Sequence, residues 1–188
     1  MKKIIAIILA ILTVFTMMSF SVSAADSTDV ARMWVCSEIS DKTGIGHVFL
    51  YFENLSDETI TIGKYNVAPG GDVSVGLFGT EGPRGGGVYY NLETELRHYS
   101  QLTGLSTKLD SDELSKVSGK IRNYSNWWDP IFNCNYFALS AWNAGSDSDI
   151  PFLLFPGLTR FFIRMKGGVA DPYDPFIRTD PVVKQTEL

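Results

Sequence analysis

Residues 45–53 read Ile-Gly-His-Val-Phe-Leu-Tyr-Phe-Glu, a run of aliphatic and aromatic residues that predicts a β-strand. Successive side chains of a strand point to opposite sides of a sheet. One face of this strand therefore carries His47, Phe49, Tyr51 and Glu53, and the other carries Val48, Leu50 and Phe52. The strand places a histidine close to its start, directly after a glycine.

Further strands are predicted on both sides of this one. They cover residues 31–39, 59–67, 73–78 and 87–92, with polar or glycine-rich turns between them. After residue 110 the apolar residues recur at helical spacing instead. A strand-rich first half followed by a helical second half predicts an α+β domain.

Three helices are predicted in the second half. The first begins at Asp110, which forms a capping-box pattern with Glu113. The second follows the N-cap residue Asn133 and covers residues 134–143. The third begins near Pro156, because proline suits the first turn of a helix. Its side chains predicted to face the core are Leu158, Phe161, Phe162 and Met165.

The N-terminus has the three-part pattern of a secretion signal. Two lysines precede an uncharged run of 17 residues, 4–20, and Val22-Ser23-Ala24 supplies the small residues of a cleavage site. The run is shorter than the ~20 residues that a membrane-spanning helix needs. We therefore expect cleavage near Ala24, a secreted domain over residues 25–170, and an extended C-terminal tail over 171–188.

Size and charge restrict the expected partners. Loss of the signal leaves 164 residues, enough for one domain, and changes the net charge from −5 to −7. An acidic protein is not expected to bind nucleic acid or anionic membrane surfaces. After cleavage no stable membrane insertion is expected. Two histidines and two cysteines without ligand spacing predict no metal site, and no cofactor is expected.

Cys134 is the candidate nucleophile, because it lies at the start of a predicted helix. Unpaired N–H groups and the helix dipole stabilise a thiolate there and offer donors to an oxyanion. His47 is the candidate base, whereas His98 lies in a polar segment and is expected to be solvated. Two alternatives remain open: Cys134 is a buried structural residue, or it forms a disulfide with Cys36.

The segment Asn133-Cys134-Asn135-Tyr136-Phe137 resembles the Asn-Cys-x-x-Phe motif of lecithin retinol acyltransferase-like proteins. These belong to the circularly permuted branch of the NlpC-like, papain-fold thiol enzymes. Residues 46–51, with a small residue and a histidine leading into aromatic and aliphatic residues, resemble the strand motif of that branch. The resemblance implies a permuted papain-like fold, an antiparallel sheet packed against helices, with Cys134 as nucleophile and His47 as base.

The family also supplies a third polar residue, on the strand after the histidine, that orients the imidazole. On the strand predicted over 59–67, the candidates for this role are Thr61 and Asn66.

The candidate substrate-binding residues are Trp127, Trp128 and Asn133. Aromatic side chains just before the predicted nucleophile helix suit the wall of a cleft.

The expected function is that of an exported thiol hydrolase or acyltransferase acting on an amide or ester. Cell-wall peptide, a glycan or a surface acyl group is the expected substrate class, by analogy with the family. One alternative is a non-catalytic module on the same fold that binds a wall glycan or peptide. Another is a secreted interaction protein, such as an immunity or colonisation factor.

Overall fold

A computed structural model describes residues 29–39, 46–80, 84–93, 102–125, 133–152, 155–170 and 181–188. Its strands are β1 (Ala31–Ile39), β2 (Gly46–Asn54), β3 (Ile60–Ile62), β4 (Tyr65–Val67), β5 (Asp72–Phe78), β6 (Gly87–Tyr90), β7 (Thr103–Leu109), β8 (Val169–Ala170) and β9 (Val183–Lys184). Its helices are α3 (Ser111–Arg122), α4 (Cys134–Gly145), α5 (Pro156–Met165) and the 3-10 turn η2 (Gln185–Glu187).

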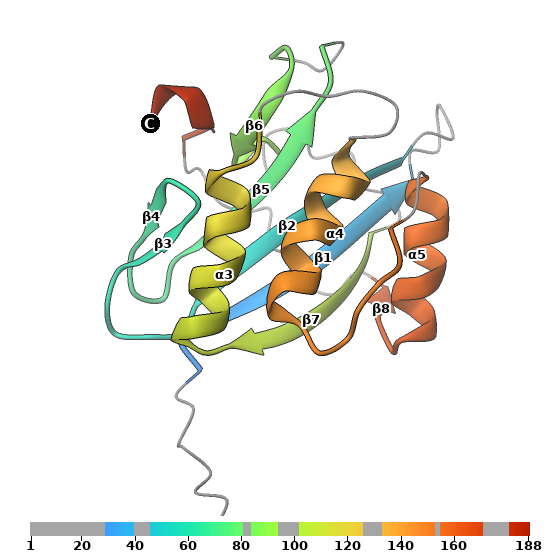
Figure 1. Cartoon of the computed structure of the whole chain (residues 1–188), viewed down its shortest axis with the longest axis horizontal. Coiled ribbons are helices and arrows are strands. Elements are labelled where there is room, and N and C mark those ends of the chain that lie inside the picture. The colour runs from blue at the N-terminus through green and yellow to red at the C-terminus, as the bar shows by residue number, and fades with distance from the viewer. Residues whose placement is uncertain are drawn as a thin grey trace, which may run out of the picture.

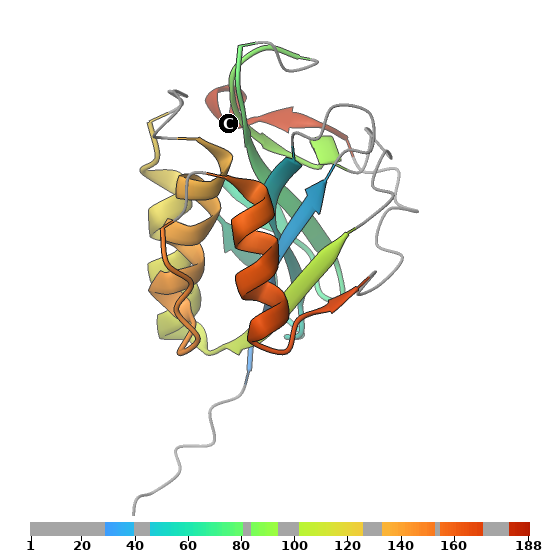
Figure 2. The same cartoon turned by 90° about the vertical axis from the view of Figure 1, so that its right-hand side faces the viewer.

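The architecture is α+β, as predicted. Seven strands form one antiparallel sheet in the order β8-β7-β1-β2-β5-β6-β9. Helices α3, α4 and α5 all lie on one face of this sheet, which Figure 1 shows from the helical side and Figure 2 from the edge. No helix in the described ranges is long and apolar enough to cross a membrane.

The main core lies between the sheet and the helices. On β2, the alternate residues Val48, Leu50 and Phe52 are fully buried there, as the sequence pattern predicts. Phe137 and Trp142 of α4 pack into the same core. The opposite face of β2 carries His47 and Phe49, and Phe49 is buried in a smaller cluster with Cys36 and Leu102. Strand β2 therefore has apolar packing on both sides.

The predicted helix starts are confirmed. The Asp110 side chain accepts from the Glu113 N–H, and the Glu113 side chain accepts from the Asp110 N–H, which completes the capping box of α3. The side chain of Asn133 caps α4, and Pro156 occupies the first turn of α5. These local signals fix where each helix begins.

The single strand predicted over 59–67 is wrong. The chain instead forms a hairpin of β3 and β4, which make a separate two-stranded sheet. Gly63 has φ +63°, a backbone conformation that reverses the chain and that glycine adopts without steric cost. The neighbour of β2 in the main sheet is β5 rather than this segment. Strand β7, which the sequence pattern did not predict, pairs with the other side of β1.

The predicted inward face of α5 is also wrong in part. Leu158, Phe161 and Met165 are 48%, 55% and 70% exposed, and Phe162 is only partly buried against the core. The side chains that α5 buries are Thr159, Arg160 and Ile163. Polar contacts to neighbouring elements, described below, hold the helix in this rotation.

The extended C-terminal tail predicted over 171–188 is in part packed on the domain. Residues 171–180 lie outside the described ranges, but β9 pairs with β6 at the edge of the sheet. Gln185 is almost fully buried, and its side chain accepts from the Tyr90 hydroxyl and donates to the Ile121 carbonyl. The predicted signal, residues 1–24, also lies outside the described residues.

Candidate active site

The structure brings Cys134 and His47 together, as predicted. Cys134 is the first residue of α4, and its thiol is within hydrogen-bonding contact of the His47 imidazole on β2. Asn133 positions this end of the helix, because its side-chain oxygen accepts from the N–H groups of Asn135 at 3.0 Å and Tyr136 at 3.3 Å. The Cys134 thiol is therefore held by a capped helix terminus on one side and a central strand on the other.

The start of β2 is open on the side that receives the helix. Strand β5 pairs with β2 only from Leu50 to Glu53, and the rest of β5, up to Phe78, pairs along its other edge with β6. The described residues of β2 before Leu50 therefore have no strand partner on that side. The N–H of Val48 donates to the Cys134 sulfur instead. The end of the β2–β5 pairing thus leaves this N–H available to the Cys134 sulfur.

A third residue, Glu93, completes the cluster, and the sequence pattern did not identify it. Its side chain is fully buried, with Oε1 3.4 Å from His47 Nε2 and Oε2 accepting from the Ser74 hydroxyl at 2.7 Å. Because Nε2 faces Glu93, Nδ1 is the ring nitrogen left for the sulfur. Glu93 follows the end of β6, at the start of the polar segment that contains His98.

Gly76 provides the space for this carboxylate. A Cβ atom at residue 76 would lie 1.8 Å from Glu93 Oε1 and 3.0 Å from His47 Nε2. Any side chain there would displace the carboxylate from the imidazole. The requirement for glycine on β5 was not visible in the sequence, because it depends on a residue from another strand.

The protonation states follow from these contacts. Burial alone would lower the pKa of His47, but its contacts with Cys134 and Glu93 raise it to about 10. Burial alone would raise the pKa of Cys134, yet His47 and the N–H groups of Val48 and Asn135 hold it below the ordinary value. The two opposed shifts favour the pair of a thiolate and an imidazolium, next to a buried carboxylate.

The site is buried but not closed. The His47 side chain is 13% exposed, and its ring packs against Phe78 at 4.6 Å and Phe49 at 5.8 Å between centroids. Glu38 is the partner of His47 across the β1–β2 pair. Burial, followed by the charge of Glu93, raises the pKa of Glu38 to about 7 against the opposing effect of His47. Acidic side chains therefore surround the imidazole on two sides.

Thr61 and Asn66 are not brought to the imidazole. Thr61 Oγ1 donates to Asn66 Oδ1 at 2.9 Å on the exposed surface of the β3–β4 hairpin. Glu93, rather than either of them, lies beside the imidazole. Trp127, Trp128 and His98 lie outside the described residues.

Cys36 differs from Cys134 in its exposure and in the direction of its pKa shift. Both thiols are free, so the structure does not support the disulfide alternative. Cys36 is 1% exposed, and burial, reinforced by the charge of Glu93, raises its pKa far above the ordinary value. Of the two, Cys134 contacts a histidine and has the lowered pKa expected of a reactive thiol.

Two further properties define what the site offers. The Asn133 cap bonds the N–H groups of Asn135 and Tyr136, so the N–H of Cys134 itself stays outside the cap. Across the described ranges, no group of three or more His, Cys, Asp and Glu side chains is placed to hold a metal ion.

Comparison of the chain with known proteins finds no match. No family model, no curated protein and no solved structure matches the chain.

Proposed function

We propose that the protein is a thiol hydrolase or acyltransferase that acts on an amide or ester. Cys134 is the nucleophile, His47 is the general acid and base, and Glu93 positions and charges the imidazole. The observation that carries this proposal is the buried Cys134–His47 contact, in which the pKa of the thiol is lowered and that of the imidazole is raised. Such opposed shifts are typical of an activated nucleophile.

In the proposed reaction, the Cys134 thiolate attacks the carbonyl carbon of the substrate and forms a tetrahedral intermediate. The N–H of Cys134, at the positive end of α4, donates to the oxyanion. The His47 imidazolium gives its proton to the leaving amine or alcohol, which leaves a thioester on Cys134. His47 then removes a proton from water or an acceptor alcohol, which attacks the thioester and releases the thiolate.

Several features support the permuted papain-like, NlpC-like assignment within this proposal. The base lies on an early strand, the nucleophile opens a later helix, and an antiparallel sheet packs against the helices. The third residue departs from the family pattern, because it is a glutamate after β6 rather than a polar residue on the strand after the histidine. The residues of the predicted signal favour export, and with it a cell-wall peptide, glycan or surface acyl group as substrate.

A chromogenic ester tests the proposal without knowledge of the natural substrate. Incubation with p-nitrophenyl acetate should release p-nitrophenol in a burst of about one equivalent. Mass spectrometry should locate the acetyl group on the peptide that contains Cys134. Cys36→Ala should retain the burst and Cys134→Ala should lose it. Equal acylation of the parent and Cys134→Ala would rule out the proposed nucleophile.

A groove between α3 and α4 favours a second candidate, the non-catalytic binding module. It has a volume of about 780 Å³ and is lined by Lys116, Lys120, Tyr124, Tyr136 and Ser140 among others. Tyrosine and lysine side chains suit a glycan or an acidic peptide. Wall material that binds equally to the parent and to Cys134→Ala, with no turnover by the parent, would favour this candidate.

A further inference from the structure

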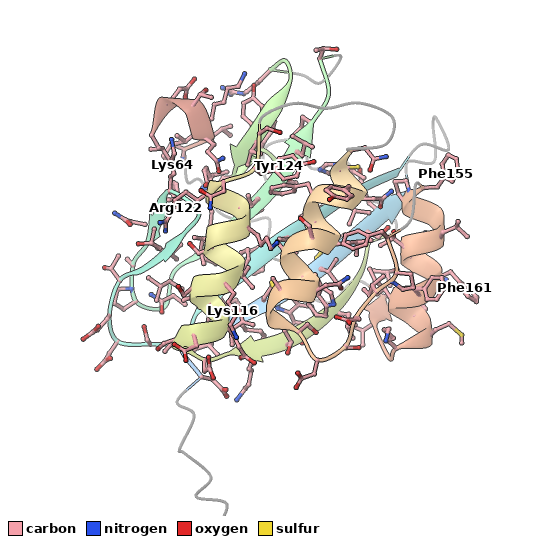
Figure 3. The ribbon with its side chains drawn as sticks, in the orientation of Figure 1. Lys64, Lys116, Arg122, Tyr124, Phe155 and Phe161 are labelled. Atoms are coloured by element: carbon pink, nitrogen blue, oxygen red, sulfur yellow. The ribbon has the colours of Figure 1, made fainter. Side chains whose placement is uncertain are left out.

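Helix α5 presents its large apolar side chains to solvent. Phe155, at its N-cap, is 64% exposed, and together with Leu158, Phe161 and Met165 it forms a continuous line at spacings of three and four residues. These four residues are called the α5 stripe. Figure 3 shows Phe155 and Phe161 at the edge of the molecule, directed away from the other helices.

Polar contacts on the inner side of α5 hold the stripe outward. Thr159 Oγ1 donates to Asn135 Oδ1 at 3.0 Å, and Arg160 Nε donates to Thr103 Oγ1 at 3.1 Å, both in buried positions. Rotation of the helix to bury the stripe would break both bonds and expose Ile163. Because unpaired buried polar groups are costly, the outward orientation is built into the fold.

The segment that carries the stripe is positively charged, between Asp149 and Asp171 in the sequence. Residues 151–170 contain three cationic side chains and no Asp or Glu, although the chain as a whole is acidic. Arg160 is buried, but Arg164 and Lys166 are exposed and lie on either side of Met165 in the sequence. The net charge of the chain argues against binding to anionic surfaces, but the charge of this segment argues for it.

We propose that the α5 stripe docks on an anionic lipid membrane. A helix with an exposed apolar face and flanking cationic side chains lies in the interface of a bilayer, with its apolar face among the acyl chains and its cations at the headgroups. The start of α5 adjoins the candidate active site, since Pro156 packs beside Gly46, the residue before His47. Docking would therefore hold that site close to the membrane surface.

Vesicle co-sedimentation tests this proposal, with the chain from Ala25 onward, which contains every described strand and helix. The probes are vesicles of phosphatidylcholine alone and vesicles with about one third phosphatidylglycerol. The parent should bind the anionic vesicles, and Phe155→Ser with Phe161→Ser should weaken this binding by roughly tenfold or more. Arg164→Gln with Lys166→Gln should reduce binding to the level seen with neutral vesicles.

Two control variants test whether vesicle binding depends on the α5 stripe. Leu55→Ser changes another exposed apolar residue, in the turn after β2, and should bind as the parent does. Cys134→Ala should also bind as the parent does, so the result does not depend on the proposed catalysis. A parent protein that stays in the supernatant with both vesicle types would overturn the proposal. So would a dimer in size exclusion that the phenylalanine variant disrupts without any vesicle binding, since the stripe would then join two copies.

Discussion

Glu93 is the residue that sets the charge of the candidate site. Its carboxylate is fully buried, contacts the imidazole of His47, and is itself held by the Ser74 hydroxyl. A buried negative charge favours the imidazolium, and the imidazolium in turn favours the thiolate of Cys134. We therefore expect the carboxylate to affect Cys134 through His47.

Replacement of Glu93 by glutamine should show this effect directly. Loss of the negative charge lowers the pKa of His47, so the thiolate loses part of its stabilisation and the pKa of Cys134 rises. The rate of Cys134 alkylation by iodoacetamide should then begin to increase at a pH about one unit higher than in the parent. Glu53→Gln is the matched control, because Glu53 pairs with Arg32 at the far end of β2. Coincident pH profiles for Glu93→Gln and the parent would exclude this role.

Substitution of Gly76 provides a second test of the contact between Glu93 and His47, because it moves the carboxylate without removing it. In Gly76→Ala the new methyl group would overlap Glu93 Oε1, so the carboxylate must move away from His47. We expect the same upward displacement of the alkylation profile, with a loss of stability of about 1–3 kcal/mol from overpacking. Gly119→Ala is the control, since a Cβ there meets no atom within 4 Å. It should stabilise α3 by about 1 kcal/mol and leave the profile unchanged.

At the scale of elements, the first turn of α4 connects folding to reactivity. The Asn133 side chain accepts from two amides of this turn, and the turn positions the Cys134 sulfur beside Val48 and His47. A poorly capped helix frays at its end. Fraying here would move the Cys134 sulfur away from His47.

Asn133→Ala should therefore lower both stability and thiol reactivity. The loss of the cap should cost about 1 kcal/mol in urea denaturation, and Cys134 should be alkylated more slowly at pH 7. Asn133→Ser retains an oxygen acceptor and should recover most of both properties. A serine variant as impaired as the alanine variant would show that Asn133 acts by packing rather than as a cap.

Elements with local signals were predictable from the sequence, and those set by distant contacts were not. The capping box at Asp110 and the alternation in β2 depend on neighbouring residues, so both were predicted correctly. The rotation of α5 depends on contacts with Asn135 and Thr103. The spacing of its apolar residues, taken alone, predicted the wrong buried face. Likewise, local sequence motifs identified Cys134 and His47 as site residues. No local motif identified Glu93, because its position in the site depends on the pairing of β6 with β5.

At the scale of the whole molecule, the C-terminus connects three separate elements. Figure 3 shows Lys64 and Arg122 beneath the C-terminal turn. The buried Gln185 side chain accepts from the Tyr90 hydroxyl on β6 and donates to the Ile121 carbonyl on α3, while its backbone carbonyl accepts from Lys64 Nζ. The Tyr90 hydroxyl also accepts from the Lys64 N–H, so the β3–β4 turn joins the same network.

Gln185→Ala should therefore destabilise the fold although only three residues follow it. It leaves the buried Tyr90 hydroxyl without its acceptor and the Ile121 carbonyl without its side-chain donor, which should cost about 1–3 kcal/mol in urea denaturation. Thr186→Ala changes an exposed neighbour and should stay within about 0.5 kcal/mol of the parent. If both variants unfold at the urea concentration of the parent, the C-terminal residues do not stabilise the domain. If only Gln185→Ala is destabilised, the fold extends to the last turn of the chain.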